Sequence, residues 1–165
     1  MKYIEKRPEP KELTTYKETP GVCYEDMASK PTVRIPVKTS LVEEQGFICC
    51  YCGQRIANDS TTIIEHIKSR KNYPKLDLDY RNMLASCDGG SKKRSERDEF
   101  GKRVNKKYPE FCDAHKKEHD IPINPLQADC EKHFIFDIDG QIIYDEEDLD
   151  PIEKTRRKKQ EKNKC

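Results

Sequence analysis

A closely spaced cysteine pair constrains the fold of this chain more than any other feature. In the stretch FICCYCGQ, residues 47–54, Cys49 and Cys52 are separated by two residues and followed by Gly53. This spacing lets both sulfurs of one turn face a single tetrahedral ion, and a glycine relieves the strain of such a turn. Thioredoxin-like redox motifs share the spacing, but they lie in a βαβ context that the sequence lacks. We therefore interpret the pair as half of a zinc site.

The composition explains why a metal ion would matter for folding. The chain has 165 residues, of which 33% are hydrophobic and 38% charged, with ten prolines and no tryptophan. Such a chain predicts one small domain with a modest core, which a metal ion can help to hold together.

The cysteine usage and the amino-terminal sequence suggest where the protein works. The first residues, MKYIEKRPEP, lack the apolar stretch of a signal peptide, and no apolar run reaches the length of a membrane span. We expect a cytoplasmic protein without a membrane partner, in which the eight cysteines are ligands or buried thiols instead of disulfides.

Two later cysteines are candidates for the second half of the zinc site. Cys87, in NMLASCDGG, and Cys112, in EFCDAHKKE, both lie where the chain turns out of apolar residues. We expect Cys50 to be a buried neighbour, because adjacent cysteines do not easily join the same knuckle. The cysteines left without an assignment are Cys23, Cys130 and Cys165.

The hydrophobic patterning predicts few regular elements and an α+β fold. Residues 37–45 are expected to form a helix closed by Gly46, and residues 61–65 a strand with His66 at its exit, followed by a long irregular loop. A short helix is expected over residues 113–118, before Pro122. The run HFIFDIDGQIIY predicts a β-hairpin that turns at Asp139-Gly140.

These elements divide the chain into three predicted parts. Residues 1–36, which are rich in proline, are expected to form an extended N-terminal arm that contacts a partner. Residues 37–144 form the zinc-stapled domain, ending in the C-terminal β-hairpin, and residues 145–165 a charged, flexible tail.

A basic segment lies between the last two candidate zinc ligands. Residues 91–107 contain eight basic residues against three acidic ones. This excess favours a loop that contacts phosphates, although a solvated insertion without a partner is equally consistent with charge alone. The candidate nucleic-acid-binding residues are Lys92, Lys93, Arg94, Arg97, Lys102 and Arg103, followed by Lys106 and Lys107.

Taken together, the motifs resemble those of the HNH endonucleases built on the ββα-metal motif. The segments that carry the resemblance are CCYCGQRI, IEHIKSRKNYP, LDYRNMLASC, CDAHK and PINPL followed by FIFDIDGQI, which span most of the chain from Pro8 to Tyr144. They look most like the HNH proteins of Septu and retron antiphage systems, which accompany an ATPase. Such proteins continue with further helical sequence after the hairpin, whereas only a short charged segment follows it here. The N-terminal arm is therefore the expected contact with the ATPase.

The resemblance implies a role for each candidate site residue. His66 is expected to activate water as the catalytic base, and Glu65 to bind a catalytic Mg²⁺ or Mn²⁺ where the family usually has aspartate. Asn82 matches the residue that braces the loop orienting the base. Either Asp113 or His115 would supply the third metal ligand. The implied substrate is DNA or structured RNA.

Other interpretations of the same residues stay open at this point. His66 could be an ordinary partly buried histidine and Asn82 a turn residue. His115 and His119, four residues apart, could face a metal from one helix or simply be polar surface. The whole domain could also be a zinc-stabilised nucleic-acid-binding or adaptor module with an inactive HNH site.

Overall fold

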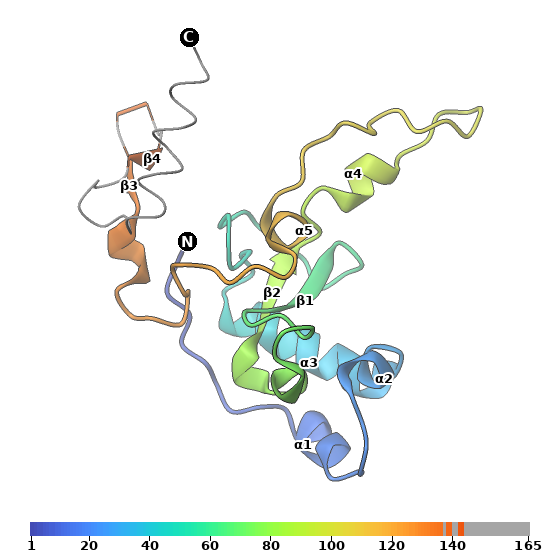
Figure 1. Cartoon of the computed structure of the whole chain (residues 1–165), viewed down its shortest axis with the longest axis vertical. Helices are drawn as coiled ribbons and strands as arrows, with labels where there is room; N and C mark the ends of the chain where they lie inside the picture. Colours follow the sequence, from blue (N-terminus) through green and yellow to red (C-terminus); the bar gives the residue numbers. More distant parts are fainter. Residues whose placement is uncertain (137, 140–141, 144–165) are drawn as a thin grey trace.

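The protein has the α+β architecture expected from its sequence. The computed structural model describes residues 1–136, 138–139 and 142–143 (Figure 1). Within these residues the α-helices are α1 (Lys11–Lys17), α2 (Tyr24–Ala28), α3 (Pro31–Glu44), α4 (Ser91–Ser95) and α5 (Cys112–Lys116). The strands are β1 (Thr62–His66), β2 (Met83–Cys87), β3 (Ile135–Phe136) and β4 (Ile142–Ile143), and short 3₁₀ turns lie at Pro74–Leu76, Tyr80–Asn82 and Cys130–His133.

The prediction of an extended arm over residues 1–36 is wrong. This segment contains α1, α2 and the first turns of α3, and its side chains Leu13, Met27 and Val33 are buried in the main core. Prolines suggested an extended chain, but Pro10 immediately precedes α1 and Pro31 opens α3, at positions where proline suits a helix start. The first 36 residues are therefore part of the same packed unit as the residues that follow.

The helix predicted over residues 37–45 is confirmed as the second half of α3. Gly46 follows it with a φ of +64°, the left-handed conformation expected of a glycine just past a helix end. At the same end the Gln45 side chain donates to the carbonyl of Ala85 and accepts from its N–H, at 2.8 and 2.7 Å. This contact fixes the start of the cysteine turn against strand β2.

Strands β1 and β2 form the central antiparallel pair. Their register places Thr62 opposite Cys87 and His66 opposite Met83. The predicted strand over residues 61–65 is thus confirmed with a shift of one residue, so that His66 is its last member. The sequence predicted an irregular loop where β2 lies, so this strand was missed. MLASC is buried at all five positions, and a strand buried on both faces shows no alternation of polar and apolar residues by which it could be recognised.

One main core joins the N-terminal helices to the sheet. Helix α3 packs against α1, α2 and both strands, and α5 packs against β2 (Figure 1). The buried residues of this core include Tyr16, Val37, Leu41, Tyr80 and Met83, with Cys49 and Cys87 at its edge. A smaller cluster of Ile4, Cys50, Ile67 and Leu84 lies beside it. The buried position of Cys50 agrees with its predicted place as a neighbour of the zinc ligands.

The remaining predicted elements are partly confirmed. Helix α5 starts at Cys112 and ends at Lys116, two residues earlier than expected, because Lys117 adopts a φ of +52°. Strands β3 and β4 pair antiparallel, as the predicted hairpin requires, while Ile138 is fully exposed in the turn between them. Gly140, Tyr144 and the predicted tail lie outside the described residues. Among the described helices, none has the length and apolarity needed to cross a membrane.

Candidate functional site

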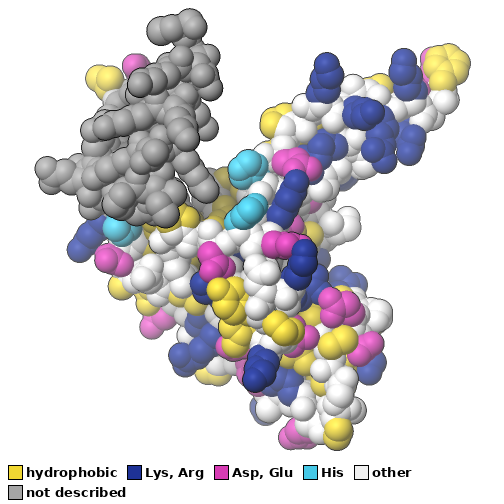
Figure 2. Space-filling view, in the orientation of Figure 1, with side chains coloured by type: hydrophobic (Ala, Val, Ile, Leu, Met, Phe, Trp, Pro, Cys, Tyr) yellow, Lys and Arg dark blue, Asp and Glu magenta, His cyan; other side chains and the backbone are white. Residues whose placement is uncertain are grey.

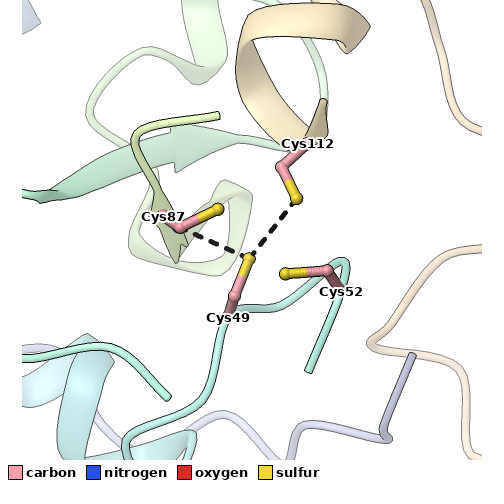
Figure 3. A group of neighbouring side chains, drawn as sticks. All are labelled: Cys49, Cys52, Cys87 and Cys112. Atoms are coloured by element: carbon pink, nitrogen blue, oxygen red, sulfur yellow. Dashed lines mark hydrogen bonds between the residues drawn. The ribbon is translucent and has the colours of Figure 1, made fainter. Parts of the chain in front are cut away.

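Four cysteines converge beside the end of strand β2. Cys49 and Cys52 lie on the turn after α3, Cys87 ends β2 and Cys112 begins α5, and their sulfurs point toward one another (Figure 3). All four Sγ atoms lie within 4.8 Å of each other, and the Sγ atoms of Cys49 and Cys112 are 3.8 Å apart. The four cysteines singled out from the sequence are therefore brought together by the fold.

The dimensions of this cluster fit a tetrahedral zinc ion. Zinc–sulfur bonds of about 2.3 Å in a tetrahedron place the sulfurs about 3.8 Å apart, which matches the Cys49–Cys112 separation. The tight turn brings Cys49 and Cys52 together: the Gly53 N–H donates to the Cys49 carbonyl at 3.0 Å, and Gly53 has a φ of +71°, which glycine adopts easily. Within the described residues the donor set is all sulfur, which suits a closed structural site.

A second group of polar side chains lies at the ends of β1 and α5 that follow these cysteines. Glu65 of β1 and Asp113 of α5 line, together with His66, an open cavity of about 290 Å³. Cys112 and Asp113 are consecutive residues, so the first turn of α5 contributes to the sulfur cluster and to this cavity. The cavity is also lined by Ser69, Arg70, Lys71 and Lys116.

Glu65 is held by two side chains, the half-buried Tyr51 and the buried Lys116. The Tyr51 hydroxyl donates to its Oε1 at 2.7 Å, and Lys116 Nζ lies 2.9 Å from the same oxygen. Burial raises the pKa of Glu65, but the hydrogen bond from Asp113, the charge of Lys116 and the Tyr51 hydroxyl together lower it below the usual value. Burial and the neighbouring Glu65 raise the pKa of Asp113 to about 8.

The two carboxyl groups affect each other in opposite directions: the pKa of Glu65 is lowered and that of Asp113 is raised, so Asp113 is the group that holds a proton. Lys116 compensates one negative charge, and a second cation would allow both carboxyl groups to ionise. Carboxylate oxygens are the ligands that Mg²⁺ and Mn²⁺ prefer, so Glu65 and Asp113 fit a hard divalent cation that would replace the proton on Asp113.

His66 is buried and held in one orientation. Its Nε2 lies 2.9 Å from the carbonyl oxygen of Asp77, and because a carbonyl can only accept, Nε2 carries the proton and Nδ1 is the basic nitrogen. The Tyr24 ring meets the imidazole edge to face at a centroid distance of 4.5 Å. Burial lowers the pKa of His66, which keeps the ring neutral and able to accept a proton at neutral pH.

Asn82 ties down the loop that follows His66. Its Oδ1 accepts from the Lys68 N–H at 2.8 Å, and its Nδ2 donates to the carbonyls of Lys68 and Leu76, each at 3.0 Å. The side chain is buried and bonds across the loop, so it is more than the local turn residue that its sequence position also allowed.

The structure separates the two candidates for the third metal ligand. Asp113 lines the cavity with Glu65, whereas His115 is exposed and is absent from the cavity lining. Because α5 ends at Lys116, His119 lies beyond the helix, and the two histidines do not form the single helical face considered above. The geometry therefore favours Asp113.

The basic segment forms a projection that leads away from the sheet. We call residues 91–110, which include α4, the basic projection, and Figure 2 shows Lys and Arg side chains along it. Arg94 donates to the carbonyl of Gly89, just before the projection, and to that of Pro109 within it, and Arg97 donates to the carbonyl of Gly101. Lys93 pairs with Glu96 at 3.5 Å, while Lys92, Lys102 and Arg103 form no ion pair among the described residues.

Several residues around the cavity were missed in the sequence. Lys116 lies three positions after Asp113 on α5, and Tyr51 lies inside the cysteine turn, so both could have been suspected from spacing. Tyr24 and Arg70 could not, because they come from elements that pack together only in the fold: Arg70 lies 4.4 Å from the Tyr24 ring and pairs with Glu25.

Comparison with known proteins supports the relationship that the motifs indicate. Over 140 residues, the chain is 28% identical to the "Retron Vc95 putative HNH endonuclease" of Vibrio cholerae serotype O1 biovar El Tor. The match covers 81% of this chain and 60% of that protein, so the chain spans about three fifths of the length of its relative. No family model matches the chain. The predicted resemblance to HNH endonucleases of retron systems is confirmed.

Proposed function

We propose that this protein is a metal-dependent HNH endonuclease that hydrolyses phosphodiester bonds in nucleic acid. The observation that carries the proposal is the meeting of Glu65, His66 and Asp113 at one open cavity, with a neutral imidazole next to a pair of carboxyl groups. These are the groups that phosphodiester hydrolysis needs, namely a base for water and ligands for a divalent cation. Sequence similarity to a retron HNH protein supports the same chemistry.

In the proposed reaction His66 accepts the proton of the attacking water on Nδ1. The hydrogen bond from Nε2 to Asp77 fixes the tautomer, and the Tyr24 ring limits rotation of the imidazole. Lys116 holds Glu65 in place and also donates to the His66 carbonyl at 2.8 Å, so one buried ammonium group positions two adjacent site residues. A Mg²⁺ or Mn²⁺ ion held by Glu65 and Asp113 would stabilise negative charge on the phosphate and the leaving oxygen.

The four-cysteine cluster has a structural role in this proposal. A zinc ion held by Cys49, Cys52, Cys87 and Cys112 would join the cysteine turn, the end of β2 and the start of α5. It would thereby set the position of Asp113 relative to Glu65, because Asp113 directly follows a ligand.

The wider context follows from the resemblance to the antiphage HNH proteins. We propose that the chain acts as the effector of such a defence system in the cytoplasm, together with an ATPase, on DNA or structured RNA. Residues 1–36 remain the proposed contact with the ATPase, now through the surfaces of α1 and α2 instead of an extended strand. The exposed cations Lys92, Lys102 and Arg103 are suited to contact phosphates without reading sequence.

The test is cleavage of plasmid DNA, single-stranded DNA and structured RNA by the wild type and by His66→Ala, with Mg²⁺, with Mn²⁺ and with neither. Loss of the base should lower the rate about 10²- to 10⁴-fold while zinc content and fold are retained. A wild type that cuts only with a divalent cation, and a variant that does not cut, would support the proposal. Equal activity of both proteins would remove His66 from the mechanism.

The assay is repeated with the ATPase if the isolated chain does not cut. Binding of nucleic acid without cleavage under both conditions would instead favour a zinc-stabilised binding or adaptor module.

A further inference from the structure

The outer end of the basic projection presents a bare aromatic ring. Phe100 has 87% of its surface exposed, more than the exposed rings of Tyr3, Phe47 and Tyr108, and it lies between Glu99 and Gly101 in a tight turn. Tyr108, nearer the base of the projection, instead packs against Phe111 at a centroid distance of 6.4 Å. An isolated exposed hydrophobic residue is common on protein surfaces, so its meaning depends on what surrounds it.

The turn that carries Phe100 is firmly built without using its ring. Asp98 Oδ1 accepts from the N–H groups of Phe100 and Lys102, at 3.0 and 2.8 Å, and the Asp98 N–H donates to the Lys102 carbonyl at 2.9 Å. Gly101 completes the turn with a φ of +76°. These bonds involve only the backbone of residue 100, so folding of the turn does not require an aromatic side chain there.

The rest of the projection holds this turn out from the domain. Arg94 Nη1 donates to the carbonyls of Gly89 and Pro109, both at 2.9 Å, and so joins the two ends of the projection. Further out, Arg97 and Arg103 face each other in an antiparallel bridge, and the Val104 N–H donates to the Glu96 carbonyl at 3.2 Å. The ring is therefore presented on a preorganised support, which lowers the entropy cost of binding.

Unpaired cations lie along the same projection, and Lys102 follows Phe100 by two residues on the same turn. The exposed basic side chains of the projection that form no ion pair among the described residues are Lys92, Lys102, Arg103, Lys106 and Lys107. Bare positive charge next to an exposed aromatic face is the combination with which proteins bind nucleic acid, because cations contact phosphates and rings stack on bases.

We propose that Phe100 stacks on an unstacked nucleobase of the bound nucleic acid while the neighbouring cations contact its phosphates. This inference rests on the proposed function and deepens it, since it assigns the projection to the substrate. Two sources could supply the base: a single strand, or a duplex in which the ring is wedged between base pairs.

The absence of tryptophan from the chain allows a direct test. Phe100→Trp introduces a single tryptophan that still stacks and can be excited apart from the tyrosines, and Val104→Trp places one on the same projection at a side chain that is 55% exposed. Each variant is titrated with a single-stranded oligonucleotide and with the matching duplex, without added divalent cation or chelator. We expect strong quenching of the tryptophan at position 100 and weak quenching at position 104.

Affinity gives a second readout. Phe100→Leu keeps an apolar side chain but removes the ring, and it should weaken binding about tenfold. Val104→Ala is the matched control and should change affinity less than twofold. Quenching with the single strand alone identifies an already unstacked base, and quenching with both probes identifies a wedge in a duplex.

Other outcomes overturn the inference. Binding without quenching at position 100, or with equal quenching at both positions, leaves only phosphate contacts. If neither probe binds, the projection serves another purpose, such as contact with a protein. Cleavage by the wild type is measured separately, so a nuclease without stacking and a stacking protein without cleavage are distinguished.

Discussion

The sulfur cluster and the carboxyl pair lie on consecutive residues of α5 and yet differ in every chemical respect. Cys112 faces three other thiols, a soft donor set with four protein ligands, while Asp113 and Glu65 line a cavity open to solvent. A site with four protein ligands has no position left for substrate, whereas a site with two carboxyl groups has several. The difference indicates that one site serves the fold and the other the chemistry.

Removing a ligand from the four-cysteine cluster should give the largest effect on stability. Cys52→Ser removes one of four zinc ligands, and a structural zinc contributes about 10–16 kcal/mol of apparent binding energy, as much as the whole stability of a small domain. We expect loss of zinc and of cooperative unfolding, measured by metal analysis and thermal circular dichroism.

Cys23→Ser is the matched control for this variant. The Cys23 Sγ lies outside the cluster and contacts the Asp26 carboxylate at 3.2 Å, so both zinc and fold should be retained. Full metal content in Cys52→Ser would disprove the four-cysteine assignment.

Substitutions in the carboxyl pair should lower activity and leave the fold unchanged. Asp113→Asn removes the charge of the proposed cation ligand, and we expect cleavage at a fixed Mg²⁺ concentration to fall about 100-fold, with a higher Mg²⁺ concentration needed for half-maximal rate. His115→Asn, two residues away and exposed, should stay within about threefold of the wild type.

Zinc content is measured in both variants, because Asp113 adjoins a zinc ligand. The opposite result, with His115→Asn inactive and Asp113→Asn active, would indicate that His115 binds the cation. It would contradict the assignment of the cation to Glu65 and Asp113.

How much of this arrangement the sequence could predict differs between the two sites. Cys49 and Cys52 were identifiable from residue type and spacing, which the sequence displays directly, while Cys87 and Cys112 were chosen because they lie where the chain turns out of apolar residues. Glu65, His66 and Asn82 were also identifiable, but only through their resemblance to known motifs. The choice between Asp113 and His115 needed the structure, because it depends on where α5 starts and which of its faces meets β1.

The N-terminal segment shows most clearly what local patterning misses. Prolines in residues 1–36 were interpreted as breakers, but in the fold Pro10 and Pro31 lie at the starts of α1 and α3, and Pro36 lies inside α3. Strand β2 was missed for a related reason, because a fully buried strand has no alternation to detect. Both elements obtain their stability from tertiary packing, which propensities do not describe.

The smallest effect is expected from a contact between the N-terminal segment and His66. Tyr24 of α2 places its ring against His66, its backbone N–H donates to the Asp77 carboxylate at 2.9 Å, and the Asp77 carbonyl accepts from the same histidine. An aromatic pair of this kind contributes about 0.5–1.5 kcal/mol. We expect Tyr24→Leu to lower the cleavage rate about 2- to 10-fold with unchanged zinc content and Mg²⁺ requirement, whereas Tyr24→Phe, which keeps the ring, stays near the wild type. Equal losses in both variants would assign the effect to the Tyr24 hydroxyl group, which lies 3.5 Å from the Ile64 carbonyl. The Asp77 carbonyl would then be the contact that fixes the position of His66.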